Sequence, residues 1–152
     1  MDTRAVRRRQ VHANREAAST APVELRPDPD VRRRLSGPAL RTFFSIAAGW
    51  QLTVQEQRAL LGWPAASTFH KYKAGDHGAL TFDTLTRLSL IIGIYKSLQI
   101  LLPGPAAIDW IHRPNQAPLF DGRPAIDLML GGVAGLFLVR AYLDGERGGD
   151  FG

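Results

Sequence analysis

Proline and glycine break up the second half of the chain, and this punctuation limits its fold more than any other feature. Pro114, Pro118 and Pro124 rule out a continuous helix between residues 110 and 124. Turn-forming residues lie between these prolines, at Asn115, Asp121 and Gly122. Pro124 is suited to the first position of a following helix. The stretch therefore predicts a loop between apolar helical segments, which indicates an interaction module rather than an active site.

The order of residues here resembles the C-terminal domain of the Xre/MbcA/ParS family of antitoxins. The matching residues are Trp110, Pro114, Asn115, Leu119, Gly122, Pro124, Asp127, the run 142–144, Gly148 and Gly149. Members of that family pair with RES-domain toxins, which consume NAD. The resemblance, which extends over residues 38–149, implies a toxin-neutralising protein with its own DNA-binding domain. Arg123 stands where the family often has a Ser or Thr that caps the next helix.

The length and composition of the chain exclude several other classes of protein. The chain has 152 residues, enough for one compact domain or two small helical units. It contains no cysteine, which excludes disulfides and thiolate chemistry. The Arg-rich start is not followed by the apolar stretch of a signal peptide, and no stretch reaches the roughly 18 apolar residues of a membrane helix. We expect a soluble, cytoplasmic protein without membrane contact.

The net charge of +5 lies entirely in the N-terminal part, because residues 1–41 hold ten Arg and five acids while residues 42–152 are balanced. Residues 1–36 lack aromatic side chains and have few large aliphatic ones. Such a segment buries too little apolar surface to offset the entropy of ordering it. We predict a flexible basic arm over residues 1–36. The arm either contacts DNA phosphates or serves only as a solvated extension.

Residues 37–104 carry the outline of a helix-turn-helix domain. A first helix is predicted from Pro38 to Gly49, and Thr53 with Glu56 has the form of a capping box that starts a second one. A third helix is expected over residues 65–73. Two short helices joined by a Gly-containing turn, here residues 62–64, are typical of a helix-turn-helix.

The third helix offers five polar side chains to a partner: Ser67, Thr68, His70, Lys71 and Lys73. Hydroxyl groups can reach base edges or phosphates, and Lys supplies charge for the phosphate backbone. We interpret this helix as a recognition helix for operator DNA. The alternative is an ordinary solvated helix face. The helix lacks the Arg or Gln of common bidentate base contacts, so modest sequence specificity is expected.

A long helix is predicted over residues 81–102, capped by Thr81. Its apolar residues cover most of its circumference, which is typical of a helix buried on several sides. We expect it to be a spine that joins the helix-turn-helix domain to a C-terminal domain over residues 105–152. The predicted fold class is therefore all-α.

The last helix is predicted over residues 133–144, with two apolar arcs. One arc holds Val133, Leu136, Phe137, Val139 and Leu143, and the other holds Ala134, Gly135, Leu138 and Tyr142. We predict that the first arc faces the core and the second binds a toxin, with Leu138 and Tyr142 as anchors. The alternative is that the second arc packs on the helix over residues 124–130. The polar end contains Glu146, Arg147, Gly148 and Gly149, and the resemblance implies that it approaches the NAD pocket of the toxin.

No catalytic pattern is present. The four histidines lie in different segments, and no Ser or carboxylate stands in a nucleophile motif. A metal site from His70, Asp76 and His77 is disfavoured, because these residues straddle a helix end. We predict a protein that is not an enzyme and has no cofactor and no metal.

Two functions of different class fit the sequence. The first is an antitoxin that neutralises a RES-domain toxin and represses its own operon through the helix-turn-helix. The second is a stand-alone transcriptional regulator whose C-terminal domain serves only oligomerisation. The expected partners are a RES-domain toxin and operator DNA, in a homodimer or a higher hetero-oligomer.

Overall fold

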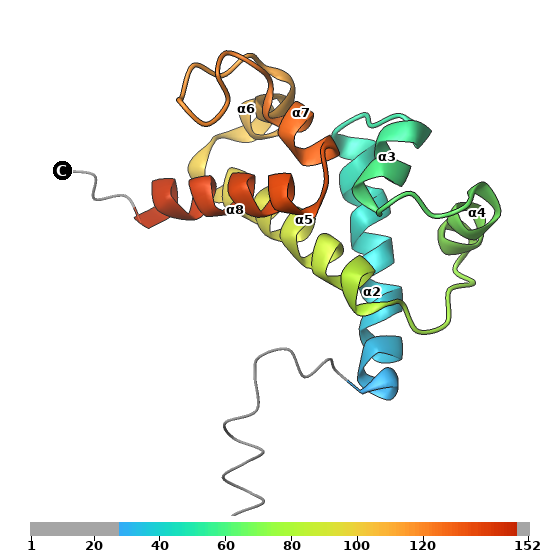
Figure 1. Ribbon diagram of the computed structural model, residues 1–152. Helices are drawn as coiled ribbons and strands as arrows, with labels where there is room; N and C mark the ends of the chain where they lie inside the picture. Colours follow the sequence, from blue (N-terminus) through green and yellow to red (C-terminus); the bar gives the residue numbers. More distant parts are fainter. Residues whose placement is uncertain (1–27, 149–152) are drawn as a thin grey trace, which may run out of the picture.

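A computed structural model describes residues 28–148, and all regular elements of these residues are helices (Figure 1). This agrees with the predicted all-α class. The elements are α2 (Pro29–Gly49), α3 (Val54–Leu60), α4 (Ala66–Ala74), α5 (Phe82–Leu101), α6 (Gly104–Asp109), the 3-10 turn η1 (Trp110–His112), α7 (Ala125–Leu130) and α8 (Val133–Gly148).

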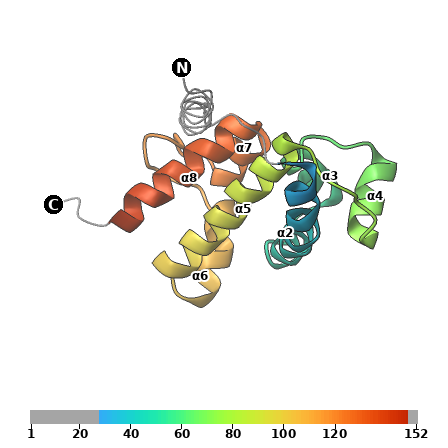
Figure 2. The same cartoon turned by 90° about the horizontal axis from the view of Figure 1, so that it is seen from below.

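The long helix α5 is the spine of the molecule. Thr81 caps it as predicted, since its side chain accepts a hydrogen bond from the Thr84 amide at 3.2 Å. Leu88, Ile91, Ile94 and Leu98 of α5 are fully buried. In Figures 1 and 2, α2 lies on one side of α5 and α8 on the other. The buried side chains of α5 therefore join those of α2 and α8 in one continuous hydrophobic core.

The first helix begins at Pro29, nine residues before the predicted start at Pro38. The prediction of a flexible arm is wrong for residues 29–36, and residues 1–27 lie outside the described part. Asp28 caps the helix, and Ser36 is fully buried. The Ser36 hydroxyl donates to the Arg32 carbonyl and accepts the Leu80 amide at 3.0 Å, while the Arg32 guanidinium donates to the Leu80 carbonyl at 3.0 Å.

The sequence did not predict the first turns of α2. The hydrogen bonds to the segment before α5 explain them, because they order a stretch that has little apolar surface to bury. Pro38 lies inside α2 and lacks the N–H that would bond back along the helix. The helix continues through it because both flanking segments are fixed by tertiary contacts.

The segment over residues 110–124 is an ordered loop, as the prolines predict. His112 Nε2 lies 2.8 Å from the Trp50 carbonyl oxygen, which fixes the start of the loop against the end of α2. An isolated antiparallel bridge joins Pro114 and Pro124 across its base. The turn at its tip places Asp121 at φ 51° and Gly122 at φ 80°, a left-handed backbone that suits these residue types.

The last helix, α8, ends at Gly148 and not at Asp144, the predicted end. Gly135 is buried where α8 crosses α7, and a Cβ at this position would overlap the Leu128 carbonyl. Part of the second apolar arc therefore packs on α7, which is the alternative that the sequence left open. This close approach of backbones requires glycine.

Candidate functional surfaces

The turn between α3 and α4 has the geometry that its sequence predicts. The capping box of α3 is formed, with Glu56 accepting from the Thr53 amide at 2.9 Å and the Thr53 hydroxyl accepting from the Glu56 amide at 3.1 Å. Trp63 has φ 61° and is 59% exposed. Arg58 donates twice to the Pro64 carbonyl and lies 5.8 Å from the Trp63 ring centroid. These contacts fix the angle at which α4 leaves α3.

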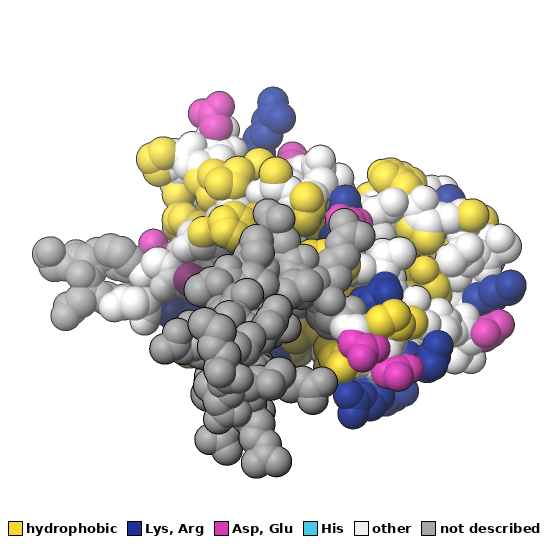
Figure 3. Space-filling view, turned by 60° about the horizontal axis from the view of Figure 1, so that its bottom comes forward, with side chains coloured by type: hydrophobic (Ala, Val, Ile, Leu, Met, Phe, Trp, Pro, Cys, Tyr) yellow, Lys and Arg dark blue, Asp and Glu magenta, His cyan; other side chains and the backbone are white. Residues whose placement is uncertain are grey.

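Helix α4 presents a polar face to the outside. Its buried contact is Phe69, which packs edge-on against Phe44 of α2 at a centroid distance of 5.7 Å. Of the five predicted DNA-binding residues, one is half-buried, Thr68, and four are exposed: Ser67, His70, Lys71 and Lys73. Figure 3 shows Lys and Arg side chains, with acids among them, on the right-hand part of the molecule where α2 and α4 lie. The arrangement of α4 thus leaves four of the five side chains free for a partner.

A second outward face lies on α8. Val133 is 36% exposed, Phe137 63% and Leu138 45%, and Ala134 and Ala141 are exposed between them. We call these five residues the α8 apolar face. Leu136, Val139 and Leu143 are buried on the opposite side. The α8 apolar face contains residues of both predicted arcs. The prediction that Val133 and Phe137 face the core is therefore wrong, whereas Leu138 is exposed as predicted.

Tyr142 is not a free anchor. It is half-buried, and its ring is stacked on Trp110 at 6.2 Å and meets Phe120 edge-on at 5.1 Å. Burial raises the pKa of the phenol above its ordinary value, and the Glu146 carboxylate raises it further. Tyr142 therefore connects α8 to the loop over residues 110–124, which the sequence alone did not indicate.

The predicted pliable end is helical as far as Gly148. Glu146, Arg147 and Gly148 are exposed on the last turn of α8, and Gly149 lies outside the described residues. The Arg147 guanidinium lies 3.4 Å from the hydroxyl of Ser97, a fully buried residue of α5. The Arg147 side chain therefore points toward α5.

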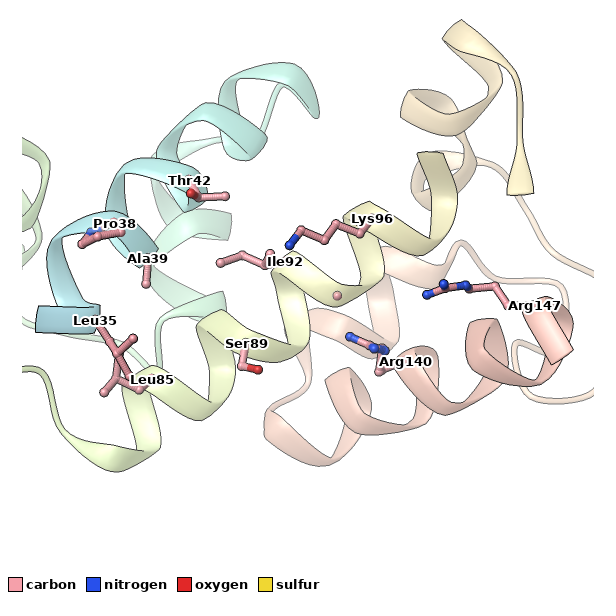
Figure 4. A pocket seen from close by; sticks show the side chains of 11 residues that line it. Leu35, Pro38, Ala39, Thr42, Leu85, Ser89, Ile92, Lys96, Arg140 and Arg147 are labelled. Atoms are coloured by element: carbon pink, nitrogen blue, oxygen red, sulfur yellow. The ribbon is translucent and has the colours of Figure 1, made fainter. Parts of the chain in front are cut away.

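A groove of about 610 Å³ is lined by residues of α2, α5 and α8 (Figure 4). Leu35, Leu85 and Ile92 form apolar parts of its wall, and Lys96, Arg140 and Arg147 are its cations. Arg140 passes over Gly93, where a Cβ would overlap its guanidinium, and pairs with Asp144 at 2.9 Å. The groove places basic side chains along one edge of the α8 apolar face.

The described residues contain no group of three or more His, Asp or Glu side chains that could hold a metal ion, and the candidate set of His70, Asp76 and His77 does not form one. No helix among these residues is long and apolar enough to cross a membrane.

The fold and its surfaces define a class of small all-α protein, in which a helix-turn-helix unit shares a spine with a second helical unit. A family model for the antitoxin Xre-like helix-turn-helix domain matches residues 30–93, and a model for the antitoxin Xre/MbcA/ParS C-terminal toxin-binding domain matches residues 97–149. The uncharacterized protein y4oB of Sinorhizobium fredii is 48% identical over 112 residues, which cover 72% of this chain and 84% of that protein. No solved structure matches.

The chain belongs to the Xre/MbcA/ParS-type antitoxins. It combines a helix-turn-helix domain with a toxin-binding domain, as a toxin-neutralising protein of this family does. The α8 apolar face and the last turn of α8 fall inside the segment that matches the toxin-binding domain.

Proposed function

We propose that this antitoxin neutralises a RES-domain toxin that consumes NAD, and that it represses its own operon by binding operator DNA through α4. The observation that carries the first part is the α8 apolar face. Phe137 and Leu138 are exposed large hydrophobic residues on neighbouring positions of one helix, within the segment similar to toxin-binding domains. Contiguous apolar surface of this kind marks a protein interface.

The neighbouring charges support the same face as an interface. Arg140 and Arg147 border it on the groove side, and the last turn of α8 carries Glu146 beyond it. An apolar centre with a charged rim is the usual anatomy of a specific protein interface. We propose that the α8 apolar face binds the toxin and that the end of the chain, with Glu146, Arg147, Gly148 and Gly149, approaches its NAD pocket.

Co-expression with the toxin encoded beside this gene tests the first part, with growth and cellular NAD as readouts. Phe137→Asp and Leu138→Asp each place a charge in the proposed interface and should abolish protection. Val54→Asp is the matched control, because Val54 is as exposed as Leu138, at 45%, and lies at the start of α3. Full protection by both α8 variants would place the toxin interface elsewhere.

The contribution of the chain end needs its own variant. Stopping the chain after Asp144 removes the last turn of α8 and leaves Leu143 in the core. We expect a folded protein that binds the toxin but restores NAD poorly. Full restoration of NAD by this variant would show that the end of the chain is not needed in the NAD pocket. That result would not contradict toxin binding by the α8 apolar face.

The operator-binding part is supported by the exposed polar face of α4. A helix of this kind fits the major groove, with its first residues at base edges. We propose that Ser67, Thr68 and His70 contact bases or nearby phosphates and that Lys71 and Lys73 contact phosphates. Replacing both lysines by Ala should weaken binding to promoter DNA and lower the log–log salt slope by about two. Unchanged binding would argue against α4 as the DNA-facing helix.

A further inference from the structure

A small cleft of about 270 Å³ lies between α2 and the C-terminal end of α4. Its apolar and aromatic walls come from Leu40, Phe44 and Tyr72. Its basic side chains are Arg41 of α2, Lys73 of α4 and His77 of the following loop, and none of the lining residues is acidic. Three separate segments thus bring basic side chains to one place.

Two of these side chains, Arg41 and His77, lie next to Gly37 of α2. A Cβ on Gly37 would lie 3.2 Å from an Arg41 guanidinium nitrogen and 3.3 Å from His77 Nε2. Both nitrogens therefore lie close to the same point of the α2 backbone. The buried glycine leaves room for the guanidinium and the imidazole ring side by side.

The hydrogen bond of His77 fixes the direction of its ring. Nδ1 lies 2.7 Å from the Gly78 carbonyl oxygen and must donate to it, since that oxygen can only accept. Nε2, on the Arg41 side, then accepts in the neutral ring and becomes a donor when the ring is protonated.

Among the described residues, neither Arg41 nor Lys73 has a carboxylate partner. Arg33, Arg87, Arg113 and Arg140 each pair with an aspartate three or four residues away. Asp76 precedes His77 but does not line the cleft. Cations held together without a counter-charge repel one another, and a bound anion removes that repulsion.

We propose that Arg41, Lys73 and His77 form a phosphate clamp that holds the DNA backbone next to α4. The inference rests on the proposed DNA binding, because Lys73 belongs both to the outer face of α4 and to this cleft. A helix lying in the major groove brings the residues beside its end to the flanking sugar–phosphate backbone. Arg41 and His77 thereby add phosphate contacts from outside the recognition helix.

The test uses the full-length protein and fluorescence anisotropy with two DNA duplexes, the promoter of its own gene and a scrambled sequence, over a series of salt concentrations. Arg41→Gln and Lys73→Gln should each lower the log–log salt slope by about one and weaken binding about 5- to 10-fold near 0.1 M salt. Both duplexes should be affected alike, because a phosphate contact carries no sequence information. His77→Gln should weaken binding less than Arg41→Gln.

Two controls make the result specific. Lys96→Gln removes an exposed cation from the other groove, on α5, and should leave affinity and slope unchanged. Circular dichroism melting of each variant should match the parent protein, since Arg41 and Lys73 are exposed. An Arg41→Gln variant that keeps the parent slope, while Lys71→Ala weakens binding, would overturn the clamp and leave DNA binding through α4 intact.

Titration with inorganic phosphate, followed by the NMR signals of the His77 ring, separates the two sources of phosphate. Competition between phosphate and DNA for the same site supports the clamp. Phosphate binding that depends on Arg41 but leaves DNA affinity unchanged in the same variant would overturn the DNA assignment in favour of a free phosphorylated molecule. Absence of any DNA binding by the parent protein would instead remove the proposed operator function itself.

Discussion

At the residue scale, Tyr142 and Phe137 lie on the same helix but differ in their surroundings. Tyr142 packs against Trp110 and Phe120 of its own chain, whereas Phe137 is 63% exposed. We expect Tyr142→Ala to lower the free energy of unfolding by about 2–3 kcal/mol, because it removes aromatic packing between α8 and the loop over residues 110–124. Urea unfolding measures this change.

Phe137→Ala is the counterpart of that variant. It should leave the free energy of unfolding within about 0.5 kcal/mol of the parent value, since an exposed side chain makes few core contacts. It should nevertheless weaken toxin binding, measured by titration calorimetry. A Tyr142→Ala variant of full stability would mean that the aromatic cluster does not hold α8 in place.

The pKa of the Tyr142 phenol gives a pH dependence with a defined sign. Burial and the Glu146 carboxylate raise this pKa in the folded protein above the ordinary value of 10.0. The folded state therefore holds the proton more tightly than the unfolded chain, and stability is fully present below pH 10 and is lost as the pH rises through the folded pKa. Tyr142→Phe should reduce the fall in unfolding free energy between about pH 9.5 and 11.

Burial also raises the pKa of Tyr72, so Tyr72 contributes to the fall in unfolding free energy that remains in Tyr142→Phe. The variant Tyr72→Phe measures that contribution separately. Glu146→Gln should reduce the fall less than Tyr142→Phe, because burial is the larger cause of the shift. Equal slopes in the parent protein and in Tyr142→Phe would contradict the raised pKa.

At the element scale, the first turns of α2 are held by polar contacts and not by apolar burial. Deleting residues 1–27 removes none of these contacts. Deleting residues 1–36 removes the buried Ser36 hydroxyl and the Arg32 guanidinium, which bond to Leu80. We expect the longer deletion to lower the melting temperature by several degrees more than the shorter one, because Leu80 is left with unsatisfied backbone groups.

Differential scanning calorimetry of the two truncated chains measures this difference. Ser36→Ala in the full-length chain is the matched point variant, since it removes the hydroxyl and keeps the helix. If both truncations melt at the same temperature, the ties to Leu80 contribute little to stability.

At the scale of the whole molecule, α5 separates two outward surfaces. Helix α4 lies against α2 on one side of the molecule, and α8 lies on α5 and α7 on the other (Figures 1 and 2). Because no residue is shared by the α4 face and the α8 apolar face, substitutions should separate the two activities. Lys71→Ala combined with Lys73→Ala should weaken promoter binding and keep protection, and Phe137→Asp should abolish protection and keep promoter binding.

Gel-shift assays and growth with the toxin, carried out on the same two proteins, measure both activities. The reciprocal result excludes misfolding as a cause, since a misfolded protein loses both. Loss of both activities in either variant would indicate that the two surfaces depend on each other.

The sequence alone determined the elements whose causes are local. The capping box at Thr53, the cap at Thr81, the apolar circumference of α5 and the prolines around residues 110–124 predicted helices and a loop that the structure confirms. Four of the five polar side chains that the sequence placed on the outer face of α4 are exposed, namely Ser67, His70, Lys71 and Lys73, while Thr68 is half-buried. These signals act within a few residues of the chain, so no tertiary information was needed.

Only the tertiary structure decided which residues far apart in sequence meet. Whether α8 turns Phe137 or Tyr142 to the outside depends on Trp110 and Phe120, and the helix over residues 29–36 depends on Leu80. The convergence of Arg41, Lys73 and His77 likewise depends on how α2 packs against α4. An apolar pattern shows that a face can be buried, but the partner that buries it is set by the packing of the whole chain.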